Sequence, residues 1–133
     1  MSEFSTAVKI PVRYRDIDTE RHVNNAVYAT YLEQARVEYI RDVIGAKPAE
    51  PDFVVASITI DFVRPIHLED EVVVELGVTD IGRSSITMVY EILADGDRAA
   101  SAESVIVTVD EDGTRPVSDE WRTRIADHEG TSF

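Results

Sequence analysis

A short polar stretch between residues 13 and 25 holds the side chains of this sequence that are best suited to acid–base or nucleophilic chemistry. In chain order, its carboxylates, imidazole and carboxamides are Asp16, Asp18, Glu20, His22, Asn24 and Asn25. A carboxylate can act as a general base or as a nucleophile, and an imidazole can exchange a proton near neutral pH. This stretch is therefore the first candidate for a reaction centre.

The stretch leads into the one long helix that the sequence predicts, over residues 26–44. Apolar and aromatic side chains at helical spacing form one face of it: Tyr28, Tyr31, Leu32, Ala35, Tyr39 and Val43. Further apolar residues such as Val37 widen this surface, so we expect other parts of the chain to wrap around the helix. Asn24 or Asn25 is a suitable N-cap, and Gly45 is a suitable C-cap.

Five segments with apolar residues at every second position predict β-strands. They cover residues 8–14, 54–62, 72–78, 86–92 and 105–109. In the first two segments the side chains expected on the inner face are Val8, Ile10, Val12 and Tyr14, then Val54, Ala56, Ile58, Ile60 and Phe62. The sequence ADGDR around Gly96 predicts a hairpin turn.

The order of these elements indicates an α+β domain, in which an antiparallel sheet curls around a helix. We expect a single domain over residues 1–133, with a polar C-terminal tail from about residue 114. Trp121 and Ile125 can anchor a short helix in that tail.

Three segments of the sequence resemble a known family. They are DIDTERHVNNAVYATYLEQARVEYI from Asp16, DFVRPIHLEDEVVVE from Asp61 and IGRSSITMVYEI from Ile81. In this order they are similar to the hotdog-fold acyl-CoA thioesterases of the 4-hydroxybenzoyl-CoA thioesterase family, from about Val8 to Val109. The resemblance implies a hotdog fold, with a five-stranded curled antiparallel sheet wrapped around one long central helix.

The resemblance also implies an activity and an assembly. Enzymes of this family hydrolyse an acyl thioester to a free acid and a thiol without a metal ion or a redox cofactor, and coenzyme A enters as part of the substrate. They form homodimers, or tetramers built from dimers, and their active sites lie between protomers. We therefore expect an acyl-CoA substrate, a homo-oligomer and a shared site, although a thioester of an acyl-carrier protein fits the sequence as well.

Near the predicted helix start, the resemblance assigns roles to individual residues. Asp18 matches the catalytic aspartate of the family, as a nucleophile or as a general base, and the alternative for it is a turn-capping role. His22 matches a histidine of the related plant acyl-carrier-protein thioesterases. It can hold a water, orient Asp18 or present its backbone N–H to the thioester oxygen, and the alternative for it is a structural hydrogen bond. Asn24 and Asn25 match the family's HVNN, and Asp16 is expected to be structural and paired with a nearby arginine.

A helix N-terminus suits this chemistry for a physical reason. It presents unpaired backbone N–H groups and the positive end of the helix dipole. Attack on a thioester carbonyl puts negative charge on the carbonyl oxygen, and these N–H groups stabilise that charge. The polar stretch thus brings a carboxylate together with an oxyanion stabiliser.

The remaining candidate residues would bind the substrate. Arg83 matches a family position that contacts the nucleotide part of coenzyme A, and Arg64 is a second candidate cation for the phosphates. For both, the alternative is a surface arginine that pairs with a nearby Asp or Glu. Ser84 and Ser85 match a family serine that positions a thioester or a water, and neither has an evident His–Asp partner for a serine-hydrolase triad. Arg21 stands where many relatives have glycine, so it can alter the loop or place a cation near the pocket mouth.

Other functions remain open at this point. A hotdog protein can bind acyl-CoA as a sensor or regulator without catalysis, and it can act as a hydratase or dehydratase. Asp18 at the helix start argues against the first, and the second usually pairs a histidine with an acidic residue in a different motif. Two roles are open for Tyr28, Tyr31 and Leu32: they line an acyl tunnel, or they belong to the core.

Composition excludes several further classes. There is no cysteine, so disulfides and cysteine–zinc sites are excluded, and the three histidines have no metal-ligand spacing. The 26 acidic residues outnumber the 13 basic ones, which gives a net charge of −13 and argues against nucleic acid as a partner. No apolar run is long enough to span a membrane, and we expect a cytoplasmic protein.

The charge also predicts a salt requirement. Only Lys9 and Lys47 are lysines, and so many carboxylates with so few lysines are typical of a halophilic protein. At about 1 M salt the Debye length is about 3 Å, whereas at about 0.01 M it is about 30 Å, so self-repulsion grows as salt is removed. The midpoint of thermal unfolding, followed by circular dichroism, should rise strongly up to molar salt. A midpoint that does not depend on salt would leave an ordinary acidic protein.

Overall fold

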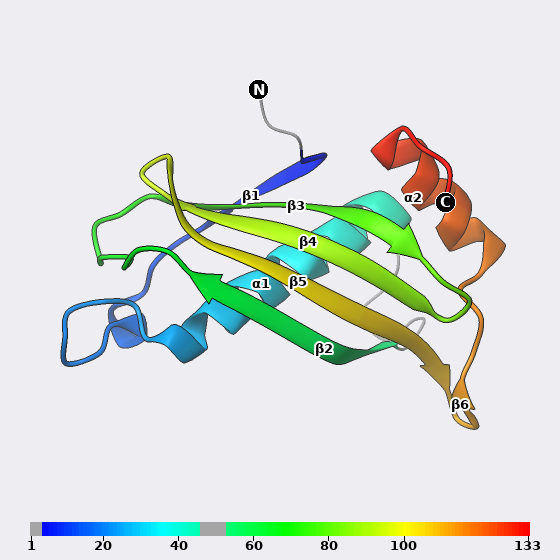
Figure 1. The fold of residues 1–133 in the computed structure, drawn as a ribbon, viewed down its shortest axis with the longest axis horizontal. Helices are drawn as coiled ribbons and strands as arrows, with labels where there is room; N and C mark the ends of the chain where they lie inside the picture. Colours follow the sequence, from blue (N-terminus) through cyan, green and yellow to red (C-terminus); the bar gives the residue numbers. More distant parts are fainter. Residues whose placement is uncertain (1–3, 46–52) are drawn as a thin grey trace.

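The computed structural model describes residues 4–45 and 53–133, which form one curled antiparallel sheet with a long helix against one face (Figure 1). Five strands follow the order β1-β3-β4-β5-β2 across the sheet: β1 (Thr6–Ile10), β2 (Phe53–Phe62), β3 (Val72–Ile81), β4 (Ser85–Ala94) and β5 (Asp97–Asp110). A two-residue strand, β6 (Gly113–Thr114), pairs with the end of β5. The predicted fold class is confirmed, with β6 added to the five expected strands.

The long helix begins and ends where the sequence predicts. Its first part is α1 (Asn25–Tyr39), and the Asn24 side chain caps it by accepting a hydrogen bond from the Ala26 amide at 2.9 Å. It continues into a π-helical turn, η2 (Ile40–Ile44), and stops at Gly45, whose φ of 77° lies in the left-handed region.

The predicted apolar face of α1 packs against the sheet. Its buried members are Tyr28, Tyr31, Leu32, Ala35 and Tyr39. Arg36 is buried on the same side, and its Nη1 donates to the Tyr90 hydroxyl at 3.2 Å, which lies 2.6 Å from the Ser104 hydroxyl. A polar network in a low-dielectric core depends strongly on geometry, so this one helps to fix the rotation of α1 against β4 and β5.

The first strand is shorter than predicted. β1 ends at Ile10, because Pro11 has no N–H to donate to a neighbouring strand. Tyr14 therefore does not face the core. It opens a 3-10 turn, η1 (Tyr14–Asp16), and its side chain is 83% exposed. An aromatic side chain is thus left at the surface beside the polar stretch.

A β-bulge changes the facing of β2. The pairing register with β5 shifts between Val55 and Ser57. Val54 is 51% exposed and lies opposite Val107, which alternates with the buried Ile106 and Thr108 of β5, so the prediction that Val54 faces inward is wrong. One extra residue reverses the alternation of side chains along a strand, and no turn residue in the sequence marks the place.

The hairpin predicted around Gly96 is confirmed. β4 ends at Ala94, β5 begins at Asp97, and Asp95 and Gly96 between them have φ values of 50° and 86°. A two-residue hairpin loop of type I′ needs positive φ at both positions, which Asp-Gly adopts readily.

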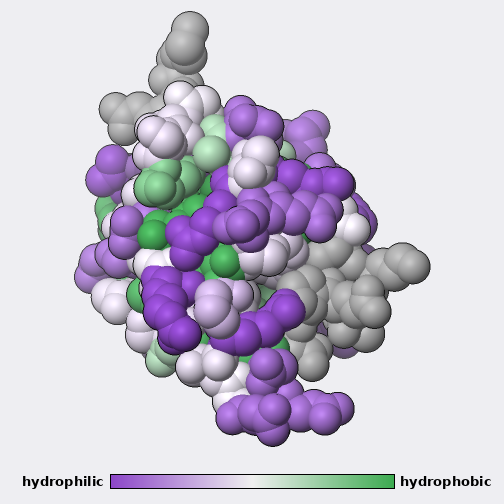
Figure 2. All heavy atoms as spheres, turned by 90° about the vertical axis from the view of Figure 1, so that its right-hand side faces the viewer, coloured by the Kyte–Doolittle hydropathy of each residue, from purple (hydrophilic) through white to green (hydrophobic). Residues whose placement is uncertain are grey.

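The C-terminal helix closes the end of the molecule that lies far from the start of α1 (Figure 1). The Ser118 hydroxyl caps α2 (Asp119–Glu129), and Trp121 and Ile125 are buried as predicted. Figure 2 looks onto this end, where hydrophilic residues make up much of the visible surface. Within the described ranges, neither helix is long and apolar enough to cross a membrane.

Candidate active site

The polar stretch before α1 is a loop whose two ends are tied together. The Asn24 amide donates to the Asp16 carbonyl at 2.8 Å, and Ile17 pairs with Val23 through an antiparallel bridge. The Val23 amide also donates to the Ile66 carbonyl at 2.8 Å, which fastens the loop to the segment between β2 and β3. The side chains of the loop are therefore held at a fixed place beside the helix start.

Asp18 lies half-buried in this loop, and its two carboxylate oxygens have different surroundings. Oδ1 accepts hydrogen bonds from the Glu20 amide at 2.9 Å and, more weakly, from the His22 amide at 3.4 Å. Oδ2 has no hydrogen-bond partner among the described residues. The turn-capping role therefore uses one oxygen and leaves the other available for chemistry.

The start of α1 has one open amide. The Asn24 side chain accepts from the Ala26 amide, and the Asn24 carbonyl accepts from the Val27 amide at 2.9 Å. The Asn25 amide has no acceptor in the part of the chain that the structure describes. At the positive end of the helix dipole, this N–H is suited to an oxygen that gains negative charge.

Asp18 and the start of α1 line a common hollow of about 430 Å³. Five of the candidate residues named from the sequence line it: Asp18, His22, Asn24, Asn25 and Arg64. Glu20, Tyr28 and Phe62 line it as well, the last at the end of β2. Residues far apart in sequence thus meet in one place that combines a carboxylate, an imidazole, an open amide and a cation.

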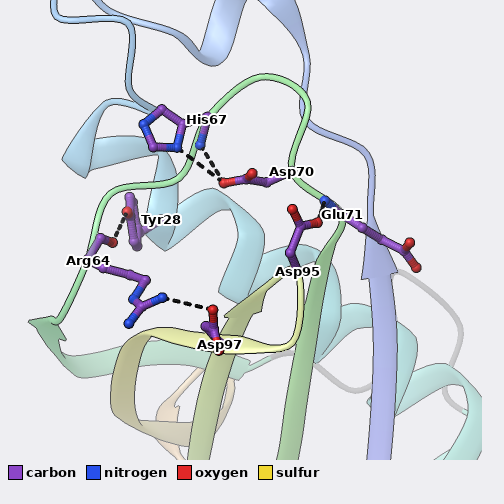
Figure 3. A network of polar contacts seen from close by, with 7 residues as sticks. All are labelled: Tyr28, Arg64, His67, Asp70, Glu71, Asp95 and Asp97. Atoms are coloured by element: carbon purple, nitrogen blue, oxygen red, sulfur yellow. Dashed lines mark hydrogen bonds and ion pairs between the residues drawn. The ribbon is translucent and has the colours of Figure 1, made fainter.

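Arg64 lies on the segment between β2 and β3 (Figure 3), and its side chain lines this hollow. Its Nη1 lies 2.9 Å from Asp97 Oδ2, and its backbone carbonyl accepts from the Tyr28 hydroxyl at 3.4 Å. Both charged side chains are more than half exposed. An exposed ion pair contributes only about 0–1 kcal/mol, so the guanidinium can exchange Asp97 for a phosphate at little cost.

His22 has a neighbour that the sequence does not reveal. Its ring meets the His67 ring edge to face, with centroids 5.1 Å apart. Asp70 orients His67, because its Oδ2 accepts from the His67 amide at 2.8 Å and lies 3.5 Å from Nδ1 (Figure 3). No motif joins these histidines, because they come together only when the β2–β3 segment crosses the loop.

The buried side chain of Asp16 links the loop to α1. Its buried Oδ2 accepts from the Tyr31 hydroxyl at 2.7 Å and from the Arg13 amide at 2.9 Å. The contact between Asp16 and an arginine is therefore made by the backbone amide of Arg13 and not by a guanidinium group. Burial raises the pKa of Tyr31, and the hydrogen bond to Asp16 and the negative charge of that carboxylate raise this pKa further.

The other three candidate residues lie elsewhere in the protomer. Arg83 and Ser84 form the turn between β3 and β4, and Ser85 opens β4, at the end of the sheet away from the start of α1 (Figure 1). The turn is tied to the C-terminal segment, because the Val117 amide donates to the Arg83 carbonyl at 2.8 Å. Within one chain the structure does not bring these residues to Asp18.

The interior of the protomer offers no acyl tunnel at the expected residues. Tyr28, Tyr31 and Leu32 are exposed by 3% or less and belong to the packed core. Tyr28 also lines the hollow from below. The core alternative for these three side chains is therefore the correct one.

The raised pKa of Tyr31 predicts a loss of stability at high pH. Above pH 10.0, the ordinary value, the unfolded chain releases a proton that folded Tyr31 keeps, so the free energy of unfolding falls as pH rises. Tyr31→Phe should reduce the slope of the free energy of unfolding against pH, and the reduction should grow from about pH 9 until it corresponds to about one proton near pH 11.5, measured by urea unfolding. Tyr14→Phe, at an exposed tyrosine, should leave the slope as in the wild type. Equal slopes for wild type and Tyr31→Phe would contradict the assignment.

Comparison with known proteins gives a consistent result. Residues 12–125 match the model of the thioesterase-like superfamily. The chain is 28% identical over 113 residues to the acyl-CoA thioester hydrolase YbgC of Escherichia coli O6:H1, which covers 80% of this chain and 84% of the relative.

Solved structures agree in fold. A thioesterase from Thermus thermophilus, complexed with coenzyme A and Zn, is 38% identical with a TM-score of 0.91, and the match covers 100% of both chains. A predicted thioesterase from Bacillus stearothermophilus is 25% identical with a TM-score of 0.85, over 92% of this chain and 94% of that one. The expected hotdog architecture is thus confirmed, and because the family model spans most of the sequence, the chain belongs to the thioesterase-like superfamily.

Proposed function

We propose that this protein is an acyl-CoA thioesterase that hydrolyses an acyl thioester to a free acid and coenzyme A at Asp18. The observation that carries the proposal is the pairing of two groups in one hollow. These are the Asp18 carboxylate, with one oxygen held and one available, and the open Asn25 amide at the start of α1. The acyl-CoA thioester hydrolase YbgC and the coenzyme A complex of the Thermus thermophilus thioesterase support the choice of substrate.

In this proposal the thioester carbonyl oxygen points toward the Asn25 amide. The carbonyl carbon becomes tetrahedral when it is attacked, and its oxygen gains a negative charge that this N–H and the helix dipole stabilise. The His22 amide is not the donor, because it already faces Asp18 Oδ1. Asn24 serves the site indirectly by capping the helix and so fixing the direction of the Asn25 N–H.

Asp18 can act in two ways with the same geometry. As a general base, Oδ2 takes a proton from a water whose oxygen attacks the carbonyl carbon, the C–S bond breaks, and the proton passes to the departing thiolate. As a nucleophile, Oδ2 attacks the carbon directly and expels the thiolate, and water then hydrolyses the mixed anhydride to regenerate the carboxylate. The His22 ring borders the same hollow and can hold the water in either route.

Replacement of Asp18 by asparagine should test this assignment. Asp18→Asn keeps the capping oxygen but removes the negative charge and the basicity, so turnover of acyl-CoA should fall by at least about 100-fold. Asp127→Asn is the control, because Asp127 is an exposed carboxylate on α2, which packs against β3 and η2 and not at the β2 edge.

The measurement is steady-state release of the coenzyme A thiol, with circular dichroism to show that both variants fold. Turnover by Asp18→Asn within a few-fold of the wild type would refute the role of Asp18. Binding of acyl-CoA by the wild type without any turnover would instead favour a sensor or regulator.

The β2 edge gives a reason to propose a dimer. β2 pairs only with β5, and its other edge has no strand beside it in the described residues. Large apolar side chains are exposed on and just beyond it: Val54, Val55, Ile58, Phe62 and Val63. A long apolar edge strand is an aggregation hazard unless it is covered, so we propose that β2 of a second copy pairs with it.

An antiparallel β2 pair would complete the site. In such a pair, the Phe62 end of one copy lies beside the Phe53 end of the other. Phe53 pairs with Thr108, and Ser85 pairs with Val107 beside it, so the Phe53 end is also the end that carries the β3–β4 turn. The second copy would thus bring its turn toward the hollow that contains Asp18, which accounts for the separation of these residues within one chain.

In this arrangement the phosphates of coenzyme A have two sources of positive charge. Arg64 comes from the chain that supplies Asp18, and Arg83 comes from the partner subunit. Arg83 is exposed and has no ion-pair partner in the described part of the chain. Ser84 and Ser85 of the partner subunit would then approach the pantetheine or the attacking water.

Mixed dimers test the shared site. Arg83→Ala alone should raise KM for acyl-CoA by about tenfold with little change in kcat, because a phosphate contact is made equally in the ground and transition states. When Asp18→Asn and Arg83→Ala chains are co-expressed and the mixed dimer is purified, one of its two sites should contain both native residues. This site should show the wild-type KM.

A site built within one chain predicts the opposite. Every active site would then carry Arg83→Ala, and the mixed dimer would show only the raised KM. A thioester of pantetheine without the nucleotide is the substrate control, because its KM should be nearly the same for wild type and Arg83→Ala. A monomer with full specific activity in light scattering would also refute the shared site.

A further inference from the structure

A second hollow, of about 510 Å³, lies against the other side of the Asp18 loop. Its lining includes Asp18 itself, together with Tyr14, Ile17, Arg21, His67 and Leu68. Asp18 is the one residue that lines both hollows. A substrate whose reacting carbon sits at Asp18 can therefore extend in two directions.

The two hollows differ in where they lie relative to β2. The first contains Phe62 at the end of the open β2 edge, and Arg64 just after it. The second contains no β2 residue and is built from the polar loop and the β2–β3 segment. In the proposed dimer the coenzyme A arm follows the first hollow toward the partner subunit, which leaves the second for the acyl group.

The second hollow offers apolar contact from residues that are otherwise left in water. Tyr14 is 83% exposed and Leu68 is 42% exposed, and both line it. Ile17, half-buried beneath the loop, adds to this lining. Each of these side chains would bury apolar surface against a carbon chain, at about 25 cal/mol per Å² removed from water.

Arg21 adds a cation to the same hollow. Its φ of 67° lies in the left-handed region, where a residue other than glycine is disfavoured by about 1–2 kcal/mol. Its guanidinium has no ion-pair partner in the described residues, although the chain has twice as many acidic as basic residues. A strained backbone that carries an unpaired cation beside the reactive carboxylate indicates a role in binding.

We infer, building on the proposed thioesterase function, that the second hollow binds a short acyl group with a terminal carboxylate, which Arg21 recognises. Tyr14 and Leu68 contact the methylene chain, and the guanidinium of Arg21 donates to the carboxylate oxygens. His67 faces the hollow as well, while its Nδ1 lies near Asp70, so its Nε2 is placed to add a further hydrogen bond. Glu69 also lines the hollow, and its negative charge repels the terminal carboxylate, so it reduces the affinity that Arg21 provides.

The packed core sets the length of the acyl group. The lining of the second hollow comes from residues 14–21 and 67–69, and none of the fully buried core residues is part of it, so the hollow does not extend into the core. A long fatty chain would run past Tyr14 and Leu68 into water and gain no further burial. An acyl group of about four to six carbons would keep its methylene groups against Tyr14 and Leu68 and its far end at Arg21.

A matched pair of substrates tests the inference. Glutaryl-CoA and pentanoyl-CoA have the same number of acyl carbons and differ in the terminal carboxylate. For the wild type, kcat/KM should be about tenfold higher for glutaryl-CoA, and this ratio should fall about tenfold in Arg21→Gln and in Arg21→Gly. Arg15→Gln, an exposed arginine of the same loop that lines neither hollow, should leave the ratio unchanged.

The outcomes separate this inference from the function on which it rests. Hydrolysis of neither substrate by the wild type would overturn the thioesterase proposal and the inference with it. Hydrolysis of pentanoyl-CoA at least as fast as glutaryl-CoA, or a ratio that Arg21→Gln does not change, would overturn the acyl site alone. The Arg21→Gly variant guards against a folding artefact, because glycine relieves the strained φ while it removes the cation.

Discussion

The candidate site depends on the closure of the backbone just before α1. The hydrogen bond from the Asn24 amide to the Asp16 carbonyl joins the two ends of the loop, and the bridge between Ile17 and Val23 tightens it. This closure holds the Asp18 carboxylate near the helix start before any substrate arrives. The conformational entropy of bringing the carboxylate to the open Asn25 amide is thus lost during folding, which is the usual source of an orientation effect in catalysis.

The same closure connects the site to the core. Tyr31, on the second turn of α1, donates a hydrogen bond to Asp16. The position of the loop therefore depends on how α1 is rotated about its own axis. That rotation is fixed in turn by the buried side of the helix, where Arg36 reaches Tyr90 on β4. Packing between α1 and the middle of the sheet therefore determines the position of the Asp16 carboxylate, and with it the position of the loop.

The regular elements could be predicted from the sequence because each depends on local chemistry. Residue types at fixed spacings are sufficient to predict the caps at Asn24 and Gly45, the Asp-Gly turn at Gly96 and the apolar face of α1. The grouping of Asp18, His22, Asn24 and Asn25 followed from their neighbourhood in the chain. The charge of Arg64 makes it a candidate, whereas its place in the site depends on how the β2–β3 segment packs at the start of α1.

The rest of the site could not be predicted because it depends on contacts between distant segments. The bulge in β2 and the exposure of Tyr14 result from how strands end and pair, and alternation alone does not reveal either. The edge-to-face pair of His22 and His67 exists only because two segments cross. Arg83 lies at the end of the sheet away from the start of α1, so a family pattern can name it without indicating how it would reach the site.

The net charge of −13 explains why binding in such a protein must be local. A polyanionic substrate is repelled by the molecule as a whole at low salt, since the field of 26 carboxylates extends over about 10 Å at 0.1 M. Attraction can come only from arginines that are in contact with the substrate and are not neutralised by a neighbouring acid. At about 1 M salt the Debye length falls to about 3 Å, which removes the long-range repulsion but leaves contacts at hydrogen-bond distance. In the proposed complex, recognition then rests on the geometry of a few guanidinium groups. Arg21 and Arg83 have no ion-pair partner among the described residues, whereas Arg64 would have to exchange Asp97 for a phosphate. Because the three arginines are attached to different segments of the fold, each would contact a different part of the ligand.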